Sequence, residues 1–188
     1  MSIHMFDLGS LKRHVACAVG TAVLVLAPLT ALAAELSQFV GTYRGNVEIA
    51  RADGGADDRD MSVDIRLTKE GFLLGWTSTT EKKDGRRKTK TYKIEFQPSA
   101  RDGVFSAAMK RNVFGHQVPL DPMAGEPFVW GRVTGDTLTV FSLFIHPNGD
   151  YEMQQYDRTL AEGGLELVYV ARLNGEPRRQ IKTFLRRD

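Results

Sequence analysis

The sequence predicts an all-β domain: an antiparallel up-and-down β-barrel of about 8–10 strands with little helix. Three observations support this prediction. Turn signals recur at intervals of roughly 10–15 residues, and the segments between them are rich in β-branched and aromatic residues. After Glu35 no segment has the apolar periodicity of an amphipathic helix.

The turn signals are dipeptides in which glycine stands next to aspartate, asparagine, glutamate or another glycine. Such residues accept a positive φ, which tight hairpin turns require. We therefore expect neighbouring strands in the sequence to be neighbours in the sheet. The dipeptides are Asp53-Gly54, Glu70-Gly71, Asp84-Gly85, Asp102-Gly103, Gly135-Asp136, Asn148-Gly149, Gly163-Gly164 and Asn174-Gly175.

The clearest strand pattern lies between Met61 and Thr68, where apolar and polar residues alternate. This alternation predicts a strand with one face in the core and one face in solvent. Two other segments, Val140 to Ile145 and Leu167 to Val170, are apolar on nearly every position. In an all-β chain this pattern predicts strands that are covered on both faces, by packing or by a partner.

The arrangement of these strands has two solutions. Closing the ribbon into a barrel removes both exposed edges, whereas a two-sheet sandwich needs longer crossover connections. The one candidate for such a crossover runs from Phe114 to Pro127, and its three prolines and two glycines predict a loop. The barrel is therefore the favoured arrangement.

The first 33 residues have the features of a signal peptide. Lys12, Arg13 and His14 precede an uncharged apolar run from residue 15 to residue 32, and Ala31 and Ala33 suit a signal peptidase. Cleavage near Ala33 would leave one domain, residues 34–188, in the periplasm or outside the cell. A retained membrane anchor is the alternative. Cleavage would also remove the one cysteine of the chain, so we expect no disulfide.

The start of the expected domain, Phe39-Val40-Gly41-Thr42-Tyr43, resembles the first strand of the calycin group, the lipocalins and fatty-acid-binding proteins. There a Gly-x-Trp unit closes the barrel floor, and Tyr43 stands where those families have tryptophan. The resemblance implies a short lead-in helix, for which residues 34–38 are the candidate. It also implies a basic residue of the last strand packed over the aromatic ring, for which Arg179 is the candidate.

Few residues suggest catalysis or metal binding. Only His116 and His146 follow the leader, and isolated histidines more often lie at turns or on the surface than bind a metal. The acidic segment from Asp53 to Asp60 lacks the spacing of a helix-loop-helix calcium loop, so a solvated turn is expected. No nucleophile elbow, zinc helix or phosphate-binding glycine loop occurs. The sequence predicts no metal, no cofactor and no enzymatic activity, with an enzyme of unrecognised type as the alternative.

The densest run of charge, residues 82–93, contains seven basic residues around an expected hairpin tip. Lys82, Lys83, Arg86 and Arg87 could bind an anionic lipid surface or an acidic protein. The alternative is a hairpin that its charges keep soluble and unable to pair edge to edge. Binding to nucleic acid is not expected, because the formal net charge of the whole chain is only +2.

Aromatic residues provide the main functional hypothesis. Those on different strands would either fill the barrel or line an apolar pocket, and the sequence leaves both open. The hypothesis is an exported, non-catalytic barrel that binds a small hydrophobic or amphipathic ligand. The alternative is an envelope interaction module that acts through the basic hairpin or a strand edge. The expected ligand contacts are Trp76, Phe96, Trp130, Phe144, Tyr169 and Arg179, with Phe128 as a further inward aromatic candidate.

Overall fold

A computed structural model describes the chain except residues 1–34, 51–53, 83, 109, 112–116 and 119. The predicted signal peptide therefore lies outside the described residues. Within the described part, no helix has the length and apolar character needed to cross a membrane.

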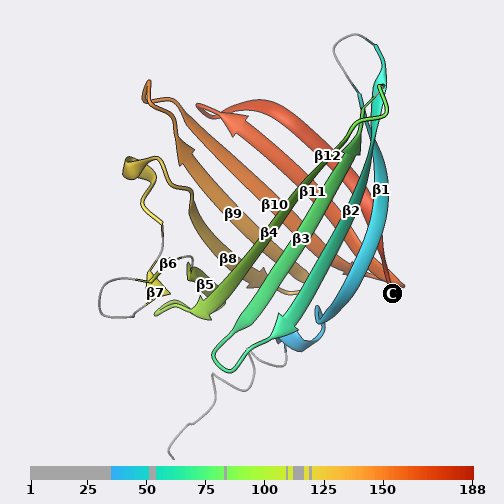
Figure 1. Ribbon diagram of the computed structural model, residues 1–188. Coiled ribbons are helices and arrows are strands. Elements are labelled where there is room, and N and C mark those ends of the chain that lie inside the picture. Colours follow the sequence, from blue (N-terminus) through green and yellow to red (C-terminus); the bar gives the residue numbers. More distant parts are fainter. Residues whose placement is uncertain (1–34, 51–53, 83, 109, 112–116, 119) are drawn as a thin grey trace, which may run out of the picture.

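Ten antiparallel strands close into one β-barrel, which confirms the predicted fold class (Figure 1). Around the barrel the order is β1, β12, β11, β10, β9, β8, β5, β4, β3 and β2, so almost every strand pairs with its neighbour in sequence. The barrel strands are β1 (Gly41–Ala50), β2 (Ala56–Leu67), β3 (Phe72–Glu81), β4 (Arg87–Pro98), β5 (Val104–Ala108), β8 (Phe128–Thr134), β9 (Thr137–Ile145), β10 (Tyr151–Ala161), β11 (Gly164–Leu173) and β12 (Glu176–Arg187).

The connection from β5 to β8 is the one long excursion between described strands. It contains the two-residue strands β6 (Lys110–Arg111) and β7 (Gln117–Val118), which pair with each other, and the 3-10 turn η1 (Pro122–Ala124). The expected loop between Phe114 and Pro127 falls partly outside the described residues. Its described part holds only β7 and η1, and it makes no crossover between two sheets.

Most of the predicted turn signals have the conformation that makes glycine favourable. Glycines at seven of the eight signals have φ between +54° and +88°: residues 54, 85, 103, 135, 149, 163 and 175. Gly71 is needed for a different reason, since a Cβ atom there would lie 2.0 Å from the carbonyl oxygen of Phe96. Close backbone approach, and not turn geometry, requires glycine at that position.

One end of the barrel is closed by the chain that leads into β1. A single helical turn at residues 35–37 precedes Phe39, which is fully buried. The hydroxyl of Tyr43 donates a hydrogen bond of 2.9 Å to the Phe39 carbonyl oxygen. Arg187, and not Arg179, lies over the Tyr43 ring, with its guanidinium carbon 5.6 Å from the ring centroid. The prediction for Arg179 was wrong because the register pairs Tyr43 with Arg187, eight residues further along β12.

The seam between β1 and β12 is short, because only two residue pairs, Tyr43 with Arg187 and Arg44 with Arg186, are in register. Next to this seam, Gly45 lies directly against β12. A Cβ atom at Gly45 would lie 2.5 Å from the carbonyl oxygen of Phe184. The close approach of the two backbones that closes the barrel therefore depends on glycine at this position.

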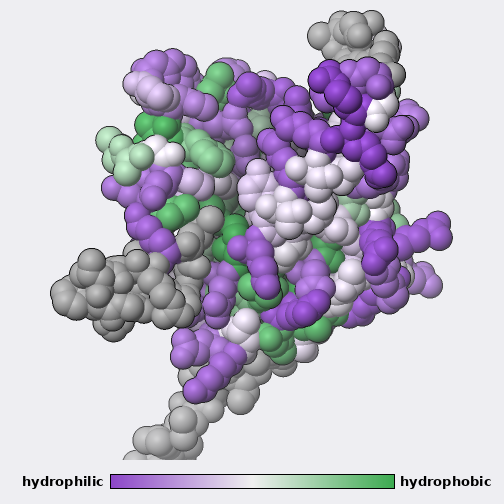
Figure 2. Space-filling model, viewed as in Figure 1, coloured by the Kyte–Doolittle hydropathy of each residue, from purple (hydrophilic) through white to green (hydrophobic). Residues whose placement is uncertain are grey.

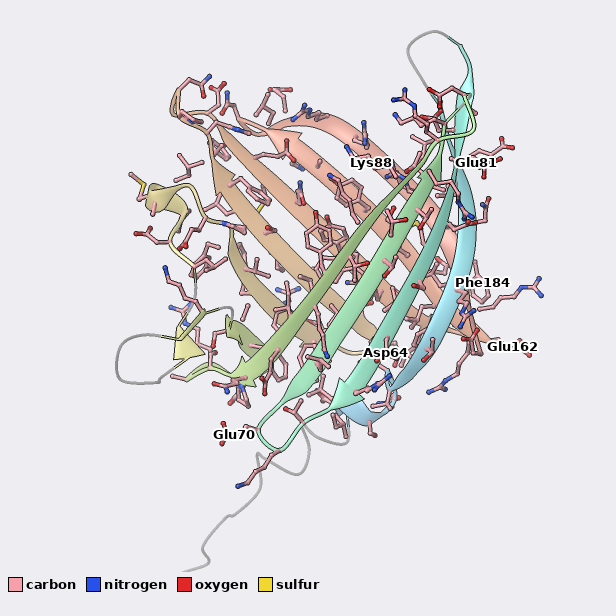
Figure 3. The ribbon with its side chains drawn as sticks, viewed as in Figure 1. Asp64, Glu70, Glu81, Lys88, Glu162 and Phe184 are labelled. Carbon is pink, nitrogen blue, oxygen red and sulfur yellow. The ribbon has the colours of Figure 1, made fainter. Side chains whose placement is uncertain are left out.

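The half of the barrel next to the closed end is filled with side chains. The Phe72 ring stacks on Phe96 at 4.8 Å between centroids and meets Phe105 edge to face at 5.1 Å. Leu74, Leu138, Leu165 and Leu185 complete this fully buried cluster. Figure 3 marks the two ends of the barrel: Glu70 and Glu162 lie in turns at the filled end, and Glu81 and Lys88 lie at the other.

Candidate functional site

The half of the barrel opposite the filled core contains a cavity of about 590 Å³. Its wall is built by β1 to β4 on one side and by β10 to β12 on the other. The size is within the range of ordinary small-molecule sites, roughly 300–1,000 Å³. Hydrophilic residues gather around the β3–β4 turn at this end of the molecule, at upper right in Figure 2.

Four aromatic rings from four strands form one contiguous group along the cavity. Trp76 on β3 stacks on Tyr92 of β4, with ring centroids 4.9 Å apart. On its other side Trp76 is 5.9 Å from Tyr156 of β10, which is 4.7 Å from Tyr169 of β11. Rings on neighbouring inward-facing positions offer a ligand flat apolar surfaces for stacking.

Two phenol groups of this aromatic group, those of Tyr156 and Tyr169, are held in the neutral form. Burial raises the pKa of Tyr156 well above its usual range, and burial also raises the pKa of Tyr169. The Tyr156 hydroxyl donates to the side-chain oxygen of Gln154, 2.9 Å away, which also lines the cavity. The site therefore combines ring faces with hydrogen-bonding groups.

The charged residues of the cavity wall are mostly basic. Asp57 is the one carboxylate among the described lining residues. The basic residues are Arg59, Lys82, Lys88, Lys90 and Arg179. Arg59 donates a hydrogen bond of 3.0 Å to the Thr80 hydroxyl. Burial, and secondarily the positive charge of Arg179, lowers the pKa of Arg59.

Arg158 lies against this aromatic group and is almost completely inaccessible to solvent, with 1 % of its surface exposed. Its guanidinium carbon is 5.8 Å from the Trp76 ring centroid and 5.7 Å from that of Tyr156. Both Nε and Nη1 are buried without a hydrogen-bond partner. Burial lowers the pKa of Arg158 to about 10. The charge of Asp157 offsets this burial only in part, and Arg158 forms no ion pair within the described part of the chain. A buried cation without an ion-pair partner is energetically expensive and marks a candidate functional position.

Three of the residues predicted to contact a ligand line this cavity: Trp76, Tyr169 and Arg179. Two others do not line it. Phe96 is fully buried in the filled half, stacked on Phe72. Phe144 is half-buried near the end of β9 and is not part of the cavity wall.

The placement of Trp130 and Phe128 inside the barrel was wrong. Their neighbours Val129 and Gly131 are buried, and side chains alternate along a strand, so both aromatic residues of β8 point outward. The Trp130 ring stacks on Phe141 at 4.9 Å and lies 5.7 Å from Phe128. The apolar outer face of β9 is thus covered in part by aromatic residues of β8, in agreement with the expectation that both faces are packed.

The sequence did not reveal three groups of the cavity: Arg59, Tyr92 and the Tyr156–Arg158 pair. The β10 segment has polar residues on both faces, with Gln154, Tyr156 and Arg158 on one face and Gln155 and Asp157 on the other. Without an apolar face, alternation cannot indicate which side is inward. The available signal was the opposing strand, where Leu167 and Tyr169 pair with Arg158 and Tyr156.

The structure divides the basic run of residues 82–93 between two surroundings. Lys82 lies at the cavity with Lys88 and Lys90. Arg86 forms an ion pair with Asp84 at 2.6 Å, and Arg87 lies 3.4 Å from Asp60, both on the exposed surface. Lys83 is outside the described residues. Binding of a partner by this hairpin stays a prediction.

The described residues contain no cluster of three or more histidine, cysteine, aspartate or glutamate residues able to hold a metal ion. His146 is exposed at the end of β9, and His116 lies outside the described residues.

No protein-family model matches the chain, and no curated protein matches its sequence. The closed barrel of ten antiparallel strands with little helix is consistent with a calycin-like architecture.

Proposed function

We propose that this protein is an exported, lipocalin-like binding protein that holds a small amphipathic molecule in the open half of its barrel, without catalysis. The main support is the cavity of about 590 Å³, whose wall carries four aromatic rings in mutual contact. Export is supported by the leader-like sequence of residues 1–33.

The size of the ligand follows from how the barrel is filled. Phe72, Phe96 and Phe105 occupy the opposite half, so a long acyl chain would have to displace a packed aromatic core. Interiors packed at crystal-like density do not open without a large energetic cost. The proposed ligand is therefore compact, with a flat ring that stacks beside Trp76 and polar groups that reach the surrounding side chains.

The two tryptophans make this proposal testable, because Trp76 lines the cavity and Trp130 faces outward. In a proton–nitrogen correlation spectrum each indole N–H gives one signal, and the variants Trp76→Phe and Trp130→Phe assign them. The probe is naphthalene-2-sulfonate, a flat amphipathic molecule. We expect the Trp76 signal to shift saturably with probe concentration while the Trp130 signal stays in place.

Two results would contradict the proposal. The first is a Trp76 signal that does not move at millimolar probe. The second is a shift confined to Trp130, which would place binding on the outer aromatic surface. Native mass spectrometry of the protein purified from its own cells then asks whether a small molecule accompanies the folded chain.

A further inference from the structure

We infer that the ligand of this cavity carries at least two negative charges on a compact, ring-containing body; this inference rests on the proposed binding function. Its basis is a local excess of positive charge. Five basic residues and one carboxylate line the described cavity wall, although the whole chain has a formal net charge of only +2. The excess is therefore a property of this cavity and not of the overall composition.

Two basic residues of the cavity wall differ in their pairing from several basic residues of the outer surface. On the outer surface, Arg44, Arg66 and Arg86 each have a carboxylate within 3.0 Å. Arg179 and Lys88, in contrast, form no ion pair with any residue that the structure describes. Neighbouring cations without counter-charges repel one another, and an anion bound between them relieves this repulsion.

The acidic residues near the cavity do not supply the missing negative charge. Glu152 lies on β10 close to the cavity, but its carboxylate is already paired with Arg178. Asp57 is the one carboxylate of the described wall. Its negative charge offsets part of the lowering of the Arg59 pKa that burial causes. A single carboxylate cannot neutralise the five basic groups of the wall.

Arg158 adds a further positive charge below the aromatic group. The rings of Trp76 and Tyr156 lie next to its guanidinium and stabilise it, but two of its nitrogen atoms have no hydrogen-bond acceptor. Cation–π contacts replace only part of the hydration that a buried guanidinium loses. A bound anion close to Trp76 and Tyr156 would act on Arg158 through a medium of low dielectric constant, where charges attract strongly.

A calorimetric titration with three naphthalene derivatives tests the inference on the full-length chain. The ring is kept constant and the charge is varied: 2-methoxynaphthalene is neutral, naphthalene-2-sulfonate has one negative charge, and naphthalene-2,6-disulfonate has two. All titrations are made at one fixed ionic strength. We expect Kd to fall along this series, with the dianion at least about tenfold tighter than the neutral probe.

Three arginine variants locate the charge effect. Arg158→Met and Arg179→Met should each weaken binding of the dianion about tenfold while leaving the neutral probe within about twofold. Arg132→Met is the matched control, because Arg132 is exposed at an outward-facing position of β8 and does not line the cavity. It should leave all three affinities unchanged. Arg179 is exposed, so its replacement tests the charge without disturbing the core.

The outcomes separate the two proposals. Equal affinity for the three probes would overturn the inference of a multiply charged ligand and leave the binding function standing. An equal loss in Arg132→Met would show that only overall charge matters and would also overturn the inference. Binding of none of the probes, together with an unmoved Trp76 signal, would overturn the binding function itself.

Discussion

Replacing Arg158 by methionine should make the ligand-free protein more stable, although it removes a residue from the centre of the barrel. A pKa lowered from the usual range of arginine to about 10 corresponds to roughly 3 kcal/mol of unfavourable free energy for the charged side chain in the folded state. Loss of the contacts with Trp76 and Tyr156 would cost about 1 kcal/mol. Methionine keeps most of the aliphatic stem, so little cavity volume is created. The net expectation is a gain of about 2 kcal/mol.

Urea unfolding followed by circular dichroism measures this difference, and scanning calorimetry gives the matching change in Tm. A gain of about 2 kcal/mol predicts an increase in Tm of about 4–8 °C for a domain of this size. The sign also follows from linkage: an arginine whose folded pKa is depressed destabilises the fold below that pKa, so the advantage of the variant should persist across neutral pH and shrink above pH 10. An unchanged or lower stability of Arg158→Met would refute the reasoning, because it would mean that the guanidinium is satisfied in the folded state.

The remaining predictions concern the barrel seam and the buried phenols. Gly45→Ala should lower the free energy of unfolding in urea by about 1–3 kcal/mol, because its Cβ would meet a β12 carbonyl oxygen at 2.5 Å. Gly75→Ala is the control: with no atom closer than 3.8 Å to its Cβ, it should be neutral or stabilising. Equal effects of the two variants would contradict the seam argument. Tyr43→Phe should lose about 1 kcal/mol with its hydrogen bond, measured in the same way, and an unchanged midpoint would oppose it. Burial raises the pKa of Tyr43, Tyr156 and Tyr169 in the folded state, so their contribution to the free energy of unfolding is complete below pH 10 and decreases at higher pH. Their phenolate absorbance should therefore appear together with the loss of circular dichroism. Ionisation of these phenols before unfolding would count against their burial.

Much of the fold could be predicted because its signals are local. A positive φ at a tight turn favours glycine wherever the turn lies, so the turn positions could be predicted from dipeptides. Alternation between Met61 and Thr68 likewise identified a strand with Val63 and Ile65 inside, and both are buried. The β1 start predicted a closed barrel floor, and the helical turn at residues 35–37 together with Tyr43 occupies that position.

The candidate site was predictable only in part. Trp76, Tyr169 and Arg179 line the cavity, and their contact with a ligand stays a prediction; the same reasoning placed Trp130 inside and did not identify Arg158. Both errors have one cause. β8 and β9 are apolar on both faces and β10 is polar on both faces, so in none of these strands does composition indicate the inward side.

Turn chemistry and side-chain alternation act over a few residues, so the amino-acid sequence alone is enough to predict a ribbon of antiparallel hairpins. Which side chains share the interior depends instead on the register between strands and on the point where β1 meets β12, and both are properties of the assembled barrel. A shift of one residue in register moves every side chain of a strand to the opposite face. For this reason the half-filled barrel, with a basic cavity above a buried arginine, became visible only when the strands were assembled.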